Sequence, residues 1–181
     1  MSFLLIRVDD RLLHGQVALG WGALLHPRIY LLADDRVAAD AWELGAYRAM
    51  APEGTRVECR GPAALGREWG GLPDREGTVV LFRGLSELAL ALEAGFEPGG
   101  AINLGGIHAS PGSQEILPFL HLTREQLGIL RTLLARGHDL FAQELPGGAR
   151  YGSVRLGEIL GGLRSQSGGE EAGGGGAGRK R

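Results

Sequence analysis

Two carboxylates, a guanidinium and an imidazole lie within six residues near the start of the chain, at Asp9, Asp10, Arg11 and His14. A largely apolar run at residues 3–8 precedes them and has the pattern of a buried strand. In an open α/β sheet, the loop after a strand is a common ligand site, because the following helix points its free N–H groups toward that loop. A histidine in this place is a candidate for phosphate chemistry.

The chemistry predicted for this loop is nucleophilic. One imidazole nitrogen can attack a phosphoryl group at neutral pH while a hydrogen bond holds the other nitrogen. Arg11 can neutralise phosphoryl oxygens, and a helix beginning at Gly15 and Gln16 can hold the same oxygens with its first N–H groups. The alternative is structural: His14 caps the helix, and Arg11 forms an ion pair with a neighbouring carboxylate. Residue types alone leave both interpretations open.

Apolar runs of strand length alternate with helical or loop segments along the chain. This alternation predicts one α/β domain whose open sheet is mainly parallel and has helices on both faces. The candidate phosphorylation site then lies at the carboxyl end of the first strand. The expected strands are at residues 3–8, 28–33, 55–60, 77–83, 100–104 and 138–145.

Polar residues and glycines also follow the later strands. Right-handed crossovers should bring these strand ends to one edge of the sheet, so we expect the residues there to line the phosphate site or to shape its loops. The residues concerned are Asp34, Asp35, Arg83, Gly84, Asn103, Gly105, Gly106 and His108, whereas His26, His121 and His138 are expected at the surface or in packing.

Several helices carry start and stop signals. Thr123 and Gln126 fit a capping box, and Gly137 stands where a left-handed residue ends a helix. Three further helices are expected: residues 15–25, weakened by glycines; residues 37–50, with Asp35 as cap; and a helix between a cap at Ser86 and a stop at Gly95.

Composition narrows the class of protein. The formal net charge of the 181 residues is −2, which gives no electrostatic reason to expect nucleic acid or an anionic membrane as a partner. The single cysteine, Cys59, excludes an internal disulfide and is expected to be a buried thiol. No apolar run approaches about 18 residues, so we expect a cytoplasmic protein, peripheral to a membrane at most. Residues 1–164 should form the domain, and residues 165–181 a flexible glycine-rich tail.

The segment from Val8 to Val17, followed by Trp21, resembles the signature of the IIB component of the mannose/fructose/sorbose family of the phosphoenolpyruvate-dependent sugar phosphotransferase system. Further segments resemble that family in the same order, so the resemblance covers about residues 3–146. These segments are residues 33–40, 51–54, 103–108 and 143–146.

The resemblance implies a parallel, helix-flanked sheet and a phosphocarrier that needs no metal and no other cofactor. His14 would be phosphorylated at Nδ1 by a IIA component and would pass the phosphoryl group to a sugar delivered through the membrane components IIC and IID. Arg11 would neutralise the phosphate, and Asp10 would orient the loop or the imidazole. The resemblance does not name the sugar.

Docking of IIA onto His14 calls for an apolar rim, for which Leu12, Leu13 and Trp21 are candidates; Trp21 fits a core position equally well. The glycine-containing stretches at residues 61–62, 70–74 and 147–150 depart from the family pattern. These departures bear on partner docking, and through it on the sugar step, more than on the chemistry of His14.

Two alternatives remain open from the sequence. One is a regulatory phosphoprotein that accepts phosphate at His14 but has no sugar acceptor. The other is a magnesium-dependent phosphohydrolase with the carboxylates of Asp9, Asp10, Asp34 and Asp35 as metal ligands. Chelation of metal separates the second alternative from histidyl transfer.

Overall fold

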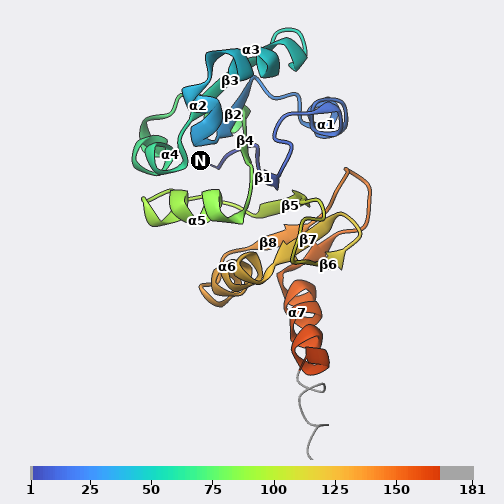
Figure 1. The fold of residues 1–181 in the computed structure, drawn as a ribbon. Helices are drawn as coiled ribbons and strands as arrows, with labels where there is room; N and C mark the ends of the chain where they lie inside the picture. Colours follow the sequence, from blue (N-terminus) through green and yellow to red (C-terminus); the bar gives the residue numbers. More distant parts are fainter. Residues whose placement is uncertain (1, 168–181) are drawn as a thin grey trace, which may run out of the picture.

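The fold is that of a computed structural model, which describes residues 2–167 (Figure 1). Within this range the main sheet has the strand order β3-β2-β4-β1-β5-β8-β9, and a separate hairpin pairs β6 with β7. The main-sheet strands are β1 (Leu5–Asp9), β2 (Ile29–Ala33), β3 (Arg56–Arg60), β4 (Thr78–Phe82), β5 (Ile102–Gly106), β8 (Leu140–Ala142) and β9 (Tyr151–Gly152), and the hairpin strands are β6 (Ser113–Leu117) and β7 (Leu120–Thr123).

Most of the helices connect these strands, and each packs against one face of the sheet. The first helical segment starts as a π-helix, η1 (Gln16–Trp21), and continues as α1 (Gly22–Leu25). The others are α2 (Asp35–Ala39), α3 (Ala41–Met50), α4 (Pro62–Glu68), α5 (Leu85–Glu93), α6 (Arg124–Ala135) and α7 (Ser153–Ser167), with the short 3-10 turns η2 (Trp69–Gly71) and η3 (Arg75–Gly77).

The predicted α/β class is confirmed. Among the described strands of the main sheet, all pairings are parallel except that of β8 with β9. Each of the six expected strands appears, and the last is shortened to Leu140–Ala142. Because β1 lies between β4 and β5, the loop that follows it opens at the middle of the sheet edge.

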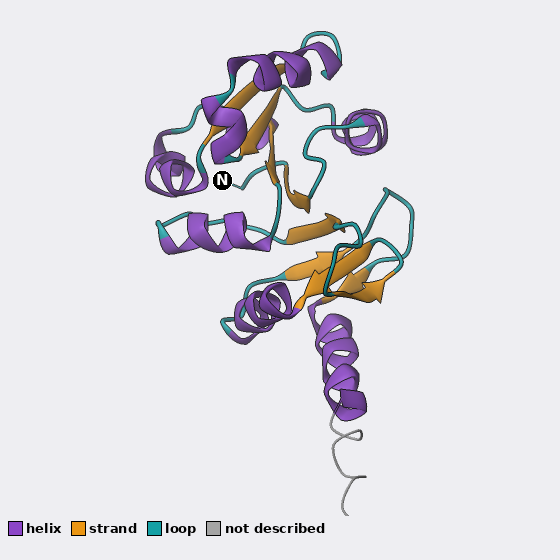
Figure 2. Ribbon diagram, viewed as in Figure 1, coloured by secondary structure: helices purple, strands orange, loops and turns teal. Residues whose placement is uncertain are grey.

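Apolar side chains alternate between the two faces of the sheet, as strand periodicity requires. From β1, Ile6 and Val8 join the core beneath α4, α5, α6 and α7. Leu5 joins the opposite core, which Trp21 and Tyr47 complete from η1 and α3. Helices therefore cover both faces, as Figure 2 shows.

Helix signals were predicted with mixed success. The capping box at Thr123 and Gln126 is present at the start of α6, so this prediction is confirmed. The helix expected over residues 37–50 is divided, because Asp40 is extended and caps α3 while Asp34, rather than Asp35, caps α2. The expected cap at Ser86 is wrong: α5 begins at Leu85 without a side-chain cap.

The sequence did not predict β6, β7, β9 or α7. The two hairpin strands are joined by only two residues, Pro118 and Phe119, and β7 runs directly into the cap of α6. The expected tail begins at residue 165, inside the last turn of α7, and otherwise lies outside the described residues.

Two further expectations concern the thiol and the membrane. Cys59 is half-buried on β3, where burial raises its pKa to about 11. None of the helices within residues 2–167 is long and apolar enough to cross a membrane.

Candidate active site

The loop after β1 is anchored by its apolar residues and exposes its polar ones. Leu12 and Leu13 are fully buried, and the backbone N–H of Leu12 donates to the carbonyl of Asp9. Leu12 adopts a left-handed conformation with φ of 55°, which costs a non-glycine residue about 1–3 kcal/mol and is held here by burial of the side chain. The expectation that Leu12, Leu13 and Trp21 form an exposed docking rim is therefore wrong, because all three belong to the core.

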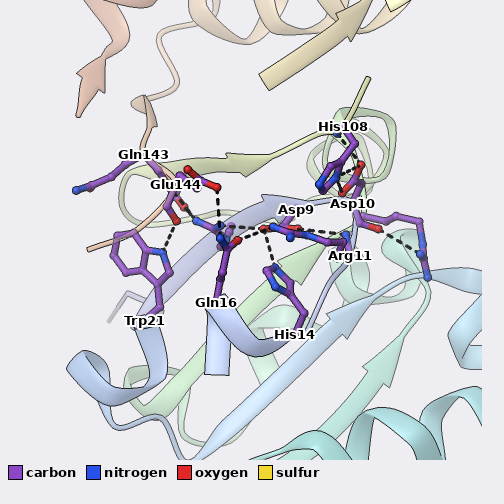
Figure 3. Close-up of polar contacts among 12 residues, drawn as sticks. Asp9, Asp10, Arg11, His14, Gln16, Trp21, His108, Gln143 and Glu144 are labelled. Carbon is purple, nitrogen blue, oxygen red and sulfur yellow. Dashed lines mark hydrogen bonds and ion pairs between the residues drawn. The ribbon is translucent and has the colours of Figure 1, made fainter. Parts of the chain in front are cut away.

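His14 lies against the carboxylate of Asp9. Its Nε2 is 3.1 Å from Oδ2 of Asp9 (Figure 3), and its side chain is only 15% exposed. A carboxylate accepts hydrogen bonds, so Nε2 carries the proton and the lone pair of the neutral ring is on Nδ1. No described residue forms a hydrogen bond with Nδ1, which leaves this nitrogen free as a nucleophile.

Asp9 is fully buried and accepts hydrogen bonds from other side chains besides His14. Arg7, also fully buried, donates from Nη2 to Oδ2 of Asp9 at 2.8 Å. Burial alone would raise the pKa of Asp9, but the hydrogen bond from His14 and the charge of Arg7 lower it below the ordinary value. Asp9 therefore remains ionised at neutral pH and fixes the orientation of the ring.

The guanidinium of Arg7 is enclosed by β5 and by the segment after β8. Its Nη1 donates to Oδ1 of Asn103 at 2.5 Å and to the carbonyl of Gln143 at 3.2 Å, whereas its Nε has no partner among the described residues. A Cβ at Gly105 would overlap this guanidinium. A β-bulge in the pairing of β1 with β5 sets Gly105 aside at this point, so the glycine makes room for Arg7.

Arg11 shares the same carboxylate from the solvent side. Its Nε is 3.4 Å from Oδ1 of Asp9, and its Nη2 donates to Oε1 of Gln16 at 2.7 Å. The side chain is 37% exposed, so the outer edge of the guanidinium remains open to a ligand. The ion pair of the structural alternative thus exists, and it holds Arg11 beside His14.

Asp10 binds a second histidine rather than His14. The Nδ1 of His108 is 2.8 Å from Oδ1 of Asp10, and the backbone N–H of His108 donates to Oδ2 at 2.8 Å. Asp10 thus ties the loop after β1 to the loop after β5, and the imidazole of His14 is held by Asp9.

Asp34 and Asp35 follow β2 but do not contact His14 or Arg11 within the described part of the chain. Asp34 caps α2 through the N–H of Val37 and forms an ion pair with Arg83. Burial would raise the pKa of Asp34, and the hydrogen bond from Arg83 lowers it below the ordinary value. Asp35 is exposed in the first turn of α2.

Three of the four carboxylates that were candidate metal ligands already bind cationic or imidazole side chains, and the fourth, Asp35, is exposed. Asp9 binds Arg7 and His14, Asp10 binds His108, and Asp34 binds Arg83. Residues 2–167 contain no group of three or more His, Cys, Asp or Glu side chains arranged to hold a metal ion. The donors of the magnesium hypothesis therefore do not converge.

The remaining predicted residues border the loop. Gly15 precedes η1 and has open space around its Cα, while Gln16 links Arg11 to Oε1 of Glu144, to which its Nε2 donates at 3.4 Å. At Gly106 an added Cβ would lie 3.4 Å from Oδ2 of Asp9 and 3.6 Å from Nη2 of Arg11. The β5 backbone therefore packs directly on the ion pair.

Comparison with known proteins identifies the family. A model of the family described as "PTS system sorbose subfamily IIB component" matches residues 3–157. The chain belongs to this family. The IIB components of this phosphotransferase system act in sugar phosphotransfer, and the resemblance seen in the sequence is confirmed.

Individual relatives agree with this assignment. The chain is 26% identical to the fructose-specific EIIB component of Bacillus subtilis over 86% of its own length and 96% of that protein. It is 27% identical to the mannose-specific EIIAB component of Escherichia coli over 75% of its own length and 42% of that protein. The crystal structure of manxB from Thermoanaerobacter tengcongensis superposes with a TM-score of 0.76 at 25% identity, covering 87% of this chain and 95% of that one.

In this IIB component the sequence predicted the loop after β1 but not the residues that hold it in place. Arg7, Gln143 and Glu144 complete the site, yet none was among the predicted site residues. Arg7 carried a usable signal, because a charged residue inside an apolar strand lies on the same face as Asp9 two residues later. Gln143 and Glu144 lie in the segment 143–146 that resembles the family, but their contacts depend on how the segment after β8 returns to η1.

Proposed function

We propose that this IIB component is a cytoplasmic phosphocarrier that accepts a phosphoryl group on Nδ1 of His14 from a IIA component and passes it to a sugar. The observation that carries the proposal is the hydrogen bond between Nε2 of His14 and Asp9. It leaves Nδ1 as the nucleophilic nitrogen, and the partly exposed guanidinium of Arg11 binds the same carboxylate.

Loading requires the lone pair of Nδ1 to attack the phosphorus atom held by the donor. A bond forms between Nδ1 of His14 and phosphorus, and the bond between phosphorus and the donor nitrogen breaks. Asp9 keeps the proton on Nε2 throughout and stabilises the positive charge that develops on the ring. Arg11 neutralises the phosphoryl oxygens during the transfer.

The partners are inferred from the family. The E. coli mannose relative is named an EIIAB component and is longer than this chain, which matches 42% of it. We infer that a IIA component donates to this protein and that IIC and IID membrane components present the sugar. The phosphoryl group then moves from His14 to a sugar hydroxyl.

Phosphate mapping tests the proposal. The protein is incubated with phosphoenolpyruvate, enzyme I, HPr and the cognate IIA, and acid-labile phosphate is located by mass spectrometry. We expect label on His14, its absence from His14→Ala, and wild-type labelling of the control His138→Ala, whose ring lies outside the site. Label elsewhere, or unchanged label in His14→Ala, would refute the proposal.

Two further arms separate the alternatives. With purified phosphorylated IIA as the donor, EDTA should leave transfer to His14 unchanged, because no step in the proposal uses a metal. Addition of membranes with the cognate IIC and IID and the sugar should discharge the label. If the label stays on His14 under those conditions, the protein is a regulatory phosphoprotein rather than a sugar-linked carrier.

A further inference from the structure

A second imidazole–carboxylate pair stands next to the phosphorylation site. Asp9 and Asp10 are consecutive, and each holds one histidine: Asp9 binds His14 and Asp10 binds His108. The roles of the ring nitrogens are reversed between the two pairs, since His14 binds through Nε2 and His108 through Nδ1. The nitrogen left free on His108 is therefore Nε2 (Figure 3).

His108 is held rigidly, although its side chain is 60% exposed. Its Nδ1 and its backbone N–H both bind the carboxylate of Asp10, and these two hydrogen bonds fix the orientation of the ring relative to its own backbone. With a proton on Nδ1 donated to Asp10, the lone pair of Nε2 is directed away from Asp10. A carboxylate, an imidazole and an open nitrogen in this order form the arrangement that activates hydroxyl groups in hydrolases.

His108 lines a pocket of about 330 Å³ that Arg11 also lines. The β6–β7 hairpin supplies one wall, with Phe119 and His121, and Glu144 supplies a carboxylate. An apolar face combined with a few hydrogen-bonding groups suits a small polyhydroxylated ligand. Arg11 belongs both to this pocket and to the group of side chains around Asp9 that holds His14, so one guanidinium connects the two.

The two proposed transfers differ in their need for a base. Transfer from a donor histidine to His14 is an exchange between nitrogens, in which the incoming nitrogen already has a lone pair. Transfer to a sugar requires a hydroxyl to lose its proton as it attacks phosphorus, and general base catalysis serves that step. His14 cannot supply the base, because Nδ1 carries phosphorus and Nε2 is bound to Asp9.

We propose that His108 is the general base of the sugar step, with Asp10 as its positioning residue and the adjoining pocket as the place where the acceptor hydroxyl enters. This inference rests on the proposed phosphocarrier function and adds a catalytic residue to it. The hydroxyl oxygen forms a bond to phosphorus while the bond from phosphorus to Nδ1 of His14 breaks. The hydroxyl proton moves to Nε2 of His108, and His14 leaves as a neutral imidazole with its proton still on Nε2.

The test measures the two transfers separately in His108→Asn. Asparagine can keep a side-chain N–H near the position of Nδ1, so the tie to Asp10 survives while the second nitrogen is removed. Loading by phosphorylated IIA should match the wild type. Discharge to sugar, measured with membranes containing cognate IIC and IID, should slow by about 10²–10⁴-fold, the usual contribution of a general base. His138→Asn is the matched control and should retain both rates.

The outcomes distinguish this inference from the function on which it rests. Wild-type discharge by a His108→Asn protein that loads normally would overturn the assignment of the base and leave the phosphocarrier intact. Equal slowing of both transfers would also overturn it, because a base for a hydroxyl has no part in loading. If the wild type is not labelled at His14, both proposals are refuted. If the wild type is labelled but transfers no phosphate to a sugar, the assignment of His108 as general base is refuted.

Discussion

Asp9 links more charged groups than any other residue described in the site. Its Oδ1 accepts from the backbone and side chain of Arg11, and its Oδ2 accepts from Arg7 and His14. The two guanidinium groups differ in burial: Arg7 has no exposed surface, whereas the Arg11 side chain is 37% exposed. The same carboxylate therefore binds one cation that supports the fold and one that is open to a ligand.

Arg11→Ala should affect rate and leave the fold intact. The Arg11 side chain is partly exposed and Asp9 keeps its buried partner Arg7, so the free energy of unfolding should change much less than in a variant that lacks Arg7. Loading of His14 should slow by about 10²–10³-fold, as expected when one donor to a developing anion is removed. Urea unfolding and single-turnover labelling measure the two effects. Arg11→Lys should recover only part of the rate, because an ammonium lacks the planar fork.

Arg7→Ala should show the opposite pattern and serves as the comparison for Arg11. Removing one partner of a buried ion pair leaves an uncompensated charge and costs about 3–5 kcal/mol. We expect a large fall in the urea midpoint of Arg7→Ala. A stable Arg7→Ala, or an unfolded Arg11→Ala, would contradict this division of roles.

At the scale of elements, close approach of the η1–α1 segment to β2 positions the start of the site. A Cβ at Gly22 would overlap the hydroxyl of Tyr30 and lie 3.3 Å from the carbonyl of Val17. Tyr30 is fully buried on β2, so its ring has little room to move aside. Gly22 lowers the helix propensity of this segment, but the close packing against Tyr30 requires a residue without a Cβ at this position.

Gly22→Ala should destabilise the protein by about 1–3 kcal/mol, the usual cost of overpacking a core. Gly45→Ala is the matched control, because Gly45 lies within α3 with no atom near the position of an added Cβ. That change should stabilise the protein by up to about 1 kcal/mol through helix propensity. Thermal unfolding measures both, and equal behaviour of the two variants would contradict the packing argument.

The order of elements explains how far sequence reasoning could reach. Alternating apolar runs predicted the parallel sheet, and the strand ends brought Arg11, His14 and His108 to one edge, because local periodicity carries that information. The sequence could not decide whether Asp9 or Asp10 is the partner of His14. The two carboxylates are alike in type, and the direction of the chain between them and His14 depends on the backbone turn at Leu12. The β6–β7 hairpin was missed because β6 begins with three polar residues and lacks an apolar run. The hairpin lies against β5 through the pairing of Leu120 with Ile107.

At the scale of the whole molecule, the buried carboxylates link folding to pH. The pKa values of Asp9 and Asp34 are both below the ordinary 3.8 in the folded protein. The folded state therefore binds fewer protons than the unfolded state in acid, and the stabilisation is present above the unfolded pKa and lost as the pH falls through the folded values.

The free energy of unfolding should accordingly decrease as the pH is lowered below about 4. Urea titrations at a series of pH values between neutrality and strong acid measure this decrease. Asp34→Asn should make the fall shallower, because one of the two linked protons is removed. Stability that stays constant or rises on acidification would show that these carboxylates are not stabilised by the fold.

Exposure of a single guanidinium edge has a consequence for encounters between carriers. In the unloaded protein, the guanidinium groups of Arg7 and Arg11 face three carboxylates, Asp9, Asp10 and Glu144, and a phosphoryl group on His14 would add about two negative charges. The local potential would therefore become more negative on loading, without any movement of the backbone. Since the sign of a surface potential governs the rate at which charged partners associate, donor and acceptor would meet two electrostatically different faces of the same loop.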